Sequence, residues 1–375
     1  MKILHIITSL GDGGAEGVLY KLCCNDFKNE HVVVSLIDQG KYGKLLLKNQ
    51  TRVYTLDMKP EKFSVITLFK LIKILKKEKP KIVQTWLYHA DFFGSIAAKL
   101  AGVKNIIWNV RHSDFDKNET KKSLLILVKI LAKLSYIMPK KIIFCSKRSI
   151  KIHKNIGYDK KKSIYIANGY DLKKFTSNPI REKLLKRKYN LSKKVPILGN
   201  VARFHPKKDH KNLLQALYFL KKNKVVFKCV LVGLEINKKN KQLVEMIKNL
   251  KLQNEVILLG TQKNINIIMN VIDIYVMSSK YGEAFPNVVA EAMACGAPCV
   301  VTDVGDASLI VDKTGWTVQP NNSKKLAVAI QKALINLHSN KGKNIRLRAR
   351  KRIYNEFTVR KMVDKYCQLW EENFT

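Results

Sequence analysis

The feature that most constrains this chain is an alternation of two kinds of segment along its length. Short apolar runs of strand length alternate with longer segments, such as residues 63–77 and 90–100, whose apolar residues recur at helical spacing. The strand-length runs of the first half are residues 2–8, 31–37, 52–57, 81–86, 105–110, 141–146 and 163–167. This alternation predicts an α/β fold with parallel sheets that carry helices on both faces.

The alternation stops and then starts again, which predicts two domains. Residues 172–194 are polar and basic and contain no strand-length run, and a second series follows at residues 195–202, 227–233, 255–260, 272–278 and 298–302. We expect four parts: an N-terminal Rossmann-like domain over 1–175, a linker over 176–194, a C-terminal domain over 195–356, and a helix over 357–375 that returns towards the N-terminal domain. Because ligands bind beyond the carboxyl ends of parallel strands, two facing sheets would form an active site in a central cleft.

The N-terminus and the cysteines predict a cytoplasmic protein. Residues 1–7 resemble the start of a signal peptide, but residues 11–14 follow without a cleavage pattern. No apolar stretch approaches the roughly 20 residues of a membrane span. The seven cysteines are odd in number and include no Cys-x-x-Cys pair, so neither a disulfide framework nor a zinc site is indicated.

The charge of the chain is strongly positive, with 70 basic and 29 acidic residues and a net charge of +41. Such a charge favours anionic partners, which include nucleic acid, a membrane face and phosphorylated substrates. Lysine is frequent throughout the chain, so a solvated surface without a specific partner explains the excess equally well. Both interpretations stay open.

The segment from Ser278 to Pro298 has the densest pattern of functional residue types. Pro286 predicts the first turn of a helix and Gly296 its end. Glu283 then precedes the helix and Glu291 lies one turn inside it, so their carboxylates could accept hydrogen bonds from sugar and ribose hydroxyls. Free amides at the helix start suit a diphosphate. The candidate donor-binding residues here are Glu283, Ala284, Phe285, Pro286, Asn287, Val288 and Glu291. An ordinary helix start with acids near it has the same spacing.

Two cations follow the first strand of the second series. Arg203 lies at the strand end and Lys208 in the loop beyond it. Departure of a nucleoside diphosphate develops negative charge, which preorganised cations stabilise. The same spacing is also common in solvated pairs, and we interpret Lys207 as a bystander.

Further candidates follow strands of the first domain. Gly13 and Gly14 open a helix after the first strand, where backbone amides can approach a phosphate, although the loop matches neither Gly-x-Gly-x-x-Gly nor a Walker loop. His89, His112 and Asn168 each follow a later strand. A histidine at a strand end is also commonly structural.

These motifs together resemble the signature of glycosyltransferase family 4, also called glycosyl transferases group 1. The resemblance runs from about residue 3 to about residue 320 and is closest to enzymes of capsule, O-antigen and exopolysaccharide biosynthesis. It implies the GT-B fold, in which two Rossmann-like domains face a central cleft. In this family the residues matching Glu283 and Glu291 contact the donor sugar and its ribose, and those matching Arg203 and Lys208 bind the diphosphate. His112 would lie beside the reacting sugar, and Gly13, Gly14, His89 and Asn168 would line the acceptor and phosphate side.

The resemblance also implies an activity. We expect a retaining glycosyltransferase that moves a hexose-type sugar from a nucleotide-diphospho-sugar, UDP-linked, to a lipid-linked saccharide. Its catalytic residues would be Arg203, Lys208, Glu283 and His112. Asp114-Phe115-Asp116 spells the metal motif of the other glycosyltransferase fold, but it lies in the acceptor domain, so we expect no metal and no cofactor.

Two other functions stay open. A sugar-nucleotide epimerase or a glycan phosphorylase would share the fold. A nucleic-acid-binding protein is indicated by charge alone, and because no recognition motif accompanies the charge we expect no nucleic acid partner.

Residues 121–134 predict an amphipathic helix with Lys122, Lys129 and Lys133 on one stripe. Such a helix suits docking on an anionic leaflet, which would make the protein peripheral on the cytoplasmic face of the inner membrane. A core helix with a solvated lysine edge has the same pattern.

Overall fold

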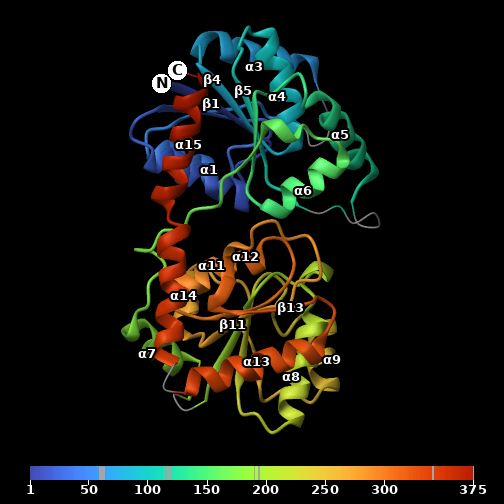
Figure 1. The fold of residues 1–375 in the computed structure, drawn as a ribbon, viewed down its shortest axis with the longest axis vertical. Helices are drawn as coiled ribbons and strands as arrows, with labels where there is room; N and C mark the ends of the chain where they lie inside the picture. The colour runs from blue at the N-terminus through green and yellow to red at the C-terminus, as the bar shows by residue number, and fades with distance from the viewer. Residues whose placement is uncertain are drawn as a thin grey trace. The chain divides into compact units, whose positions relative to one another are not determined.

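The computed structural model describes residues 1–58, 64–113, 115, 120–189, 191–192, 195–339 and 342–374. The chain forms two compact units, Met1–Gly169 with Val359–Thr375 and Tyr170–Thr358 (Figure 1). Each unit contains one sheet in which every described strand pairing is parallel. This confirms the expected pair of doubly wound α/β units.

The first unit has a seven-stranded sheet in the order β3-β2-β1-β4-β5-β6-β7. Its strands are β1 (Lys2–Ile7), β2 (Glu30–Ser35), β3 (Arg52–Thr55), β4 (Ile82–Trp86), β5 (Ile106–Val110), β6 (Lys141–Phe144) and β7 (Ser163–Tyr165). All seven lie within the runs expected from the sequence, except that β2 begins one residue earlier. The central strands β4 and β5 are buried along their whole length, which explains why they appear as continuous apolar runs.

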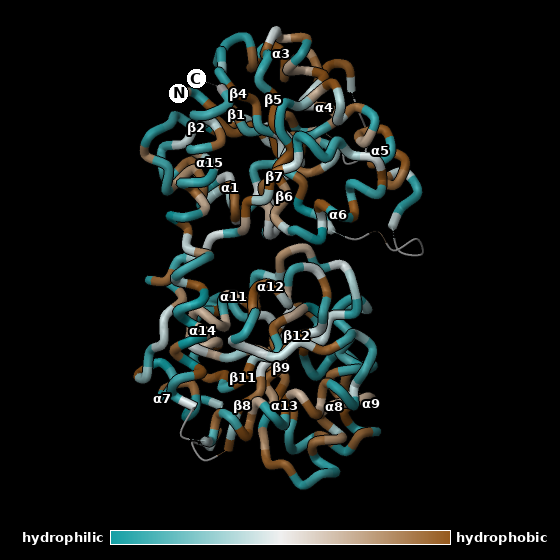
Figure 2. The backbone as a smooth tube through the Cα atoms, viewed as in Figure 1, coloured by the Kyte–Doolittle hydropathy of each residue, from teal (hydrophilic) through white to brown (hydrophobic). Residues whose placement is uncertain are grey.

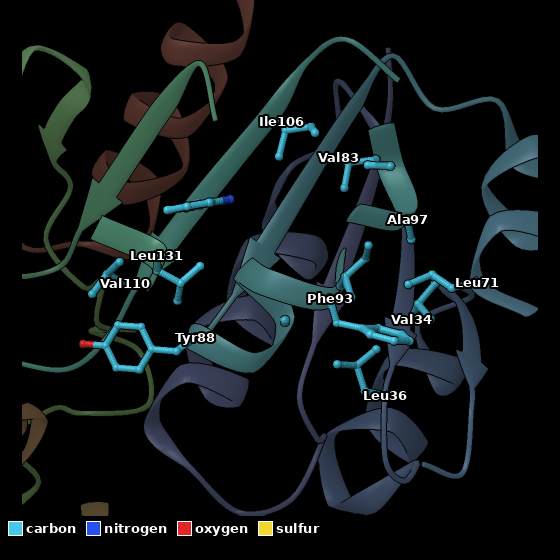
Figure 3. Packing of buried hydrophobic residues seen from close by; sticks show 14 of the residues in the cluster. Val34, Leu36, Leu71, Val83, Tyr88, Phe93, Ala97, Ile106, Val110 and Leu131 are labelled. Carbon is cyan, nitrogen blue, oxygen red and sulfur yellow. The ribbon is translucent and has the colours of Figure 1, made fainter. Parts of the chain in front are cut away.

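Helices cover both faces of this sheet. One face carries α3 (Val65–Glu78), α4 (Tyr88–Leu100) and α5 (Lys122–Leu134), with α6 (Lys147–Ile156) beside α5. Figure 3 shows side chains of α3, α4 and α5 packed on this face against Val34 and Val83 of the strands. The other face carries α1 (Gly14–Asn25), α2 (Gly40–Lys48) and α15 (Val359–Phe374).

The C-terminal helix α15 belongs to the first unit through buried aromatic residues. Tyr366 and Trp370 are fully buried against the strands. Trp370 Nε1 donates a hydrogen bond to Gln84 Oε1 (3.1 Å), and Asn109 Nδ2 donates one to the Tyr366 hydroxyl (2.8 Å). The last helix of the chain therefore completes the core of the first unit.

The second unit has a six-stranded sheet in the order β10-β9-β8-β11-β12-β13. Its strands are β8 (Ile197–Val201), β9 (Lys228–Val232), β10 (Val256–Leu258), β11 (Ile274–Met277), β12 (Cys299–Thr302) and β13 (Trp316–Val318). Its helices are α7 (Pro179–Lys188), α8 (His210–Lys222), α9 (Lys241–Asn249), α10 (Ile265–Ile268), α11 (Asn287–Ala294), α12 (Ala307–Val311), α13 (Ser323–His338) and α14 (Gly342–Glu356). Helices α8, α9 and α13 share one core with the strands, and α11 and α12 contact β11 and β12. The hydropathy colouring shows hydrophobic residues in the interior of each unit (Figure 2).

Two features of the second unit differ from the sequence expectations. The unit begins at Tyr170, so the segment 176–194 belongs to it rather than forming a free connection, and α7 starts there at Pro179 with an Asn178 side-chain cap. Strand β13 is not among the expected strands, because Thr317 separates its two apolar residues and Gly315 and Gln319 flank them, so no apolar run stands out.

None of the described helices is long and apolar enough to cross a membrane.

Candidate active site

In the second unit, the cationic loop and the glutamate loop lie side by side because β8 and β11 are neighbouring parallel strands. Arg203 follows the carboxyl end of β8, and Lys208 ends the short 3₁₀ turn at Pro206–Lys208. Glu283 lies in the loop between β11 and α11. The carboxyl edge of the sheet therefore brings the two loops together.

Lys208 and Glu283 form an ion pair. Lys208 Nζ lies 2.5 Å from Glu283 Oε1, and Ser279 Oγ donates to the same oxygen at 2.7 Å. Their side chains retain 26% and 12% of their exposure, so the pair is only partly open to solvent. The arrangement places the ammonium group of Lys208, which has three N–H donors, beside a carboxylate acceptor. These are the groups that a phosphate and a sugar hydroxyl require at neighbouring positions.

Hydrogen bonds between the two loops fix this pair. Ser278 Oγ donates to the Lys208 carbonyl (2.8 Å), and the Lys280 amide donates to the Lys207 carbonyl (2.8 Å). Thr302 at the end of β12 donates to the Ser279 carbonyl (2.6 Å). Because the backbone on both sides of the ion pair is held, Lys208 and Glu283 are preorganised.

Gly305 lets a third loop approach the glutamate segment. Its φ is +61°, and a Cβ there would lie 2.4 Å from the Glu283 carbonyl oxygen and 2.6 Å from that of Ala284. The Asp306 amide donates to the Ala284 carbonyl at 2.8 Å. Only glycine fits this contact, so the loop after β12 helps to fix the position of Glu283.

Helix α11 begins beside this pair. Its N-cap is Pro286, no side chain caps it, and Glu291 lies partly buried in its second turn. The positive end of the helix at Asn287 and Val288 is suited to an anion. Gly296, with φ +86°, follows the end of the helix as expected.

Two of the expected donor-binding side chains have structural contacts. Phe285 is buried, stacks on Tyr170 and packs edge-on against Phe357. Asn287 Oδ1 accepts a hydrogen bond from the Tyr170 hydroxyl at 2.6 Å. The side chains at these two positions are therefore occupied by contacts within the second unit.

The remaining cations of the β8 loop point in different directions. Arg203 is exposed, whereas the Lys207 ammonium lies 5.6 Å from the centre of the Tyr281 ring. His210 at the start of α8 is buried, and burial, with the nearby Lys208 charge, lowers its pKa to about 4. His210 is therefore neutral near pH 7 and adds no charge to the site.

In the first unit, the glycine loop carries its own carboxylate. Gly13 is the N-cap of α1, and the Glu16 carboxylate lies so close that a Cβ on Gly13 would fall 2.2 Å from Glu16 Oε2. Glu16 is buried, which raises its pKa against opposing hydrogen bonds from its own amide and Ser9. A side chain at Gly13 would displace the Glu16 carboxylate, which accepts a hydrogen bond from its own backbone amide at the start of α1.

His112 is held at the end of β5 from the adjacent helix α6. Ser149 Oγ donates to the His112 carbonyl at 2.6 Å, and the His112 ring lies 5.2 Å from that of Phe115 and 6.4 Å from that of Tyr88. His153 Nδ1 donates to the Ser149 carbonyl (2.8 Å), so its Nε2 accepts from the Tyr88 hydroxyl (2.7 Å). Figure 3 shows this hydroxyl pointing away from the aliphatic core.

Asn168 and His89 lie at other strand ends of the same sheet. Arg111 joins Asn168 to the C-terminal helix, because its Nη1 donates to Asn168 Oδ1 (2.5 Å) and its Nη2 to the Tyr366 hydroxyl (2.8 Å). His89 is partly buried in the first turn of α4, two residues after Leu87, which has φ +74°. A positive φ at leucine is uncommon and often marks a functional position.

No metal is expected from the sequence, and Asp114 and Asp116 lie outside the described residues. His5, Cys23 and His31 are close enough together to hold an ion. However, His5 Nδ1 accepts from Trp86 Nε1 (3.2 Å), His5 Nε2 then donates to His31 Nδ1 (2.9 Å), and His31 Nε2 donates to Asp26 (3.0 Å). All four ring nitrogens are used, so this cluster fits a structural network better than a metal site.

Several residues of the site were not singled out from the sequence. Ser279 lies in the segment from Ser278 to Pro298, between β11 and α11. Its position just after a buried strand could have indicated a functional residue. Arg111 precedes His112 and could have been found in the same way. Tyr366 is 255 residues from Arg111, and no local pattern indicates their contact.

Comparison with known proteins agrees with this architecture. The family "Glycosyltransferase Family 4" matches residues 13–174 and "Glycosyl transferases group 1" matches residues 181–352. An Escherichia coli UDP-Gal:alpha-D-GlcNAc-diphosphoundecaprenol alpha-1,3-galactosyltransferase is 29% identical over 81% of this chain and 78% of its own. A Campylobacter jejuni N,N'-diacetylbacillosaminyl-diphospho-undecaprenol alpha-1,3-N-acetylgalactosaminyltransferase is 28% identical over 63% of this chain and 62% of its own.

Solved structures share the fold. The crystal structure of Anabaena HepE in complex with UDP has a TM-score of 0.87 and 22% identity, and the match covers 99% of this chain and 100% of the other. A glycosyltransferase from Rickettsia africae has a TM-score of 0.83 and 22% identity over 99% and 98% of the two chains. The chain is a glycosyltransferase with the GT-B fold and belongs to family 4 of these enzymes.

Proposed function

We propose that this glycosyltransferase moves a hexose-type sugar from a UDP-linked donor to a lipid-linked saccharide and retains the anomeric configuration. The observation that carries the donor part is the Lys208–Glu283 pair beside the uncapped start of α11. A lysine and a helix N-terminus suit a diphosphate, and a carboxylate 2.5 Å from the lysine suits the hydroxyls of the attached sugar.

The reaction would need charge stabilisation more than a base. The bond between the anomeric carbon and the diphosphate oxygen breaks while the acceptor hydroxyl bonds to that carbon from the same face. The hydroxyl proton passes to an oxygen of the departing diphosphate. Arg203, Lys208 and the amides of α11 stabilise the charge that grows on the diphosphate, in the role that a metal has in other enzymes. Glu283 orients the donor sugar, Glu291 the ribose, and His112 the sugar or acceptor.

The relatives support the acceptor class. The names of the Escherichia coli and Campylobacter jejuni enzymes both mention a saccharide linked to undecaprenol diphosphate. Other similar proteins include a Staphylococcus aureus capsular polysaccharide biosynthesis glycosyltransferase, 25% identical over 82% of this chain and 78% of its own. We therefore assign this chain to the assembly of a cell-surface polysaccharide on a lipid carrier.

A lipid-linked acceptor requires access to a membrane, and α5 suits that contact. Lys122, Lys129 and Lys133 are exposed, and Ile126 and Ile130 beside them are 59% and 42% exposed. The tube of α5 carries both hydrophobic and hydrophilic colouring (Figure 2). Helix α5 thus has a solvent-facing side of lysine and isoleucine, which favours peripheral docking on the anionic cytoplasmic leaflet.

The test is a screen of UDP-sugars with an undecaprenyl-diphospho-saccharide in detergent. We expect release of UDP that depends on the acceptor, a product with the donor's anomeric configuration, and turnover that survives EDTA. Epimerised UDP-sugar without acceptor would instead indicate an epimerase, and sugar phosphate formed from free phosphate would indicate a phosphorylase. Loss of turnover in EDTA with rescue by Mg²⁺ or Mn²⁺ would contradict the metal-independent mechanism alone.

A further inference from the structure

A lysine-lined hollow lies at the amino-terminal edge of the first sheet, opposite the strand ends that carry His112 and Asn168. Its volume is about 430 Å³. It is lined by Lys99, Lys104, Ile137, Met138, Pro139, Lys140, Lys141, Lys162 and Asn373. Within the described part of the chain no acidic side chain lines it, so the hollow is a concentrated positive site.

The lysines come from the ends of several elements. Lys99 lies in the last turn of α4, Lys104 precedes β5, Lys141 begins β6 and Lys162 precedes β7. Burial, with a contribution from Lys99, lowers the pKa of Lys162 even though Asp159 is nearby. Bringing like charges together costs free energy unless an anion offsets it, and here the fold itself converges them.

Large exposed side chains line the hollow or adjoin its lining in the sequence. Ile137 lines the hollow and is 69% exposed. Leu100 and Tyr136, which directly adjoin the lining residues Lys99 and Ile137 in the sequence, are 60% and 58% exposed. Lys162 Nζ donates to the carbonyls of Ser135 (3.0 Å) and Tyr136 (2.5 Å), so a lysine of the hollow fixes the segment that carries the apolar rim. A phosphate in solution would use the lysines but leave these apolar side chains in water. A phosphate at a lipid surface would use both.

We propose that this hollow binds the phosphate headgroup of an anionic phospholipid while Leu100, Tyr136 and Ile137 insert at the bilayer interface. The inference rests on the proposed membrane-linked acceptor and adds a specific headgroup site to the docking side of α5. Helix α5 joins the two, since its 13 residues run about 20 Å from the His112 edge of the sheet to the hollow. The headgroup site would hold the active edge close to the bilayer that carries the acceptor.

The experiment compares two variants with the same change in charge. One variant is Lys99→Gln/Lys104→Gln/Lys141→Gln in the hollow. The control is Lys44→Gln/Lys48→Gln/Lys365→Gln, which removes exposed lysines of α2 and α15 on the opposite face of the same sheet. Sedimentation with phosphatidylglycerol–phosphatidylcholine vesicles measures binding. We expect the hollow variant to bind about fivefold more weakly for each lysine removed, and the control to change by no more than about twofold.

Equal losses in the two variants would mean diffuse attraction and would overturn the headgroup site, as would no loss in the first. Inorganic phosphate is the second probe. If it stabilises the wild type thermally, the hollow variant loses that stabilisation, and vesicle binding is unchanged, the hollow binds a soluble anion and the lipid assignment is wrong. Sugar transfer to a detergent-solubilised acceptor should be normal in both variants. If the wild type itself shows no transfer, that result counts against the proposed function and not against this site.

Discussion

Asp91 is a carboxyl group that the fold keeps out of water. It is fully buried in the first turn of α4, and Thr85 Oγ1 donates to its Oδ1 at 2.5 Å. Burial raises its pKa to about 8, against opposing hydrogen bonds from Thr85 and the Asn109 amide. Asp91 is therefore mostly protonated near pH 7, next to the strand end that leads to His89.

This burial makes stability depend on pH. In the unfolded chain an aspartate ionises near pH 4, so the neutral form favours folding fully below about pH 4. That contribution falls by about 1.4 kcal/mol per pH unit as the pH rises towards about 8, and it is constant above. Asp91→Asn retains an oxygen for Thr85 and does not ionise. We expect urea unfolding from pH 5 to 8 to show a shallower decline for this variant and greater stability than wild type at pH 8.

Asp12→Asn is the matched control, because that side chain is 71% exposed. Its pH profile should follow the wild type. A parallel decline in Asp91→Asn and wild type would show that Asp91 is ionised in the folded protein.

At single positions, the sequence singled out candidate residues within short motifs. Glu283 and Lys208 come from loops that follow neighbouring strands, so each could be proposed from its own motif and their 2.5 Å contact follows from strand order. The side chain of Asn287 could not be placed in this way. Its hydrogen bond to Tyr170 spans 117 residues, and no spacing within the helix motif indicates it.

Among the elements, α15 carries two of the largest fully buried side chains, Tyr366 and Trp370. Trp370 is fully buried, and its ring lies among those of His5, His31 and Tyr366. We expect Trp370→Ala to lower the free energy of unfolding by about 3–5 kcal/mol, because it leaves a cavity and an unpaired Gln84. Thermal unfolding of the full chain measures this, with Trp370→Phe expected to lose less.

Tyr354→Ala on α14 provides the comparison, since that aromatic side chain is 65% exposed. It should change stability by less than about 1 kcal/mol. Equal effects of the two alanine variants would mean that α15 does not complete the first core.

The type of most elements could be predicted from the spacing of their apolar residues alone. The unit to which each element belongs could not be predicted in this way. The strands were found because parallel strands buried on both faces are continuous apolar runs. The return of the last helix towards the N-terminal domain was an expectation that its apolar residues alone do not require, since an apolar face does not identify the sheet that covers it. Helix α7 was taken as linker because it is polar on nearly every side, with only Leu185 and Lys186 buried.

For the whole molecule, charge and family lead to different partners. A charge of +41 alone is compatible with nucleic acid, membrane or no partner. The positions of the lysines separate these possibilities, because Lys208 contacts a carboxylate at a strand end while Lys99 and its neighbours line a hollow in the other unit. We propose that Lys208 binds the donor diphosphate and that the lysines of the hollow bind a lipid surface.

The central claim is that Lys208 stabilises the departing diphosphate, and its neighbour Lys207 provides the control. Single-turnover sugar transfer from the UDP-sugar donor should be measured for wild type, Lys208→Ala and Lys207→Ala. Both variants lose one positive charge from the same loop, but only Lys208 contacts Glu283, whereas Lys207 lies over Tyr281. We predict that Lys208→Ala raises the barrier of the chemical step by about 2–4 kcal/mol and that Lys207→Ala transfers at nearly the wild-type rate. Near-normal transfer by Lys208→Ala, or an equal loss in both variants, would contradict the account.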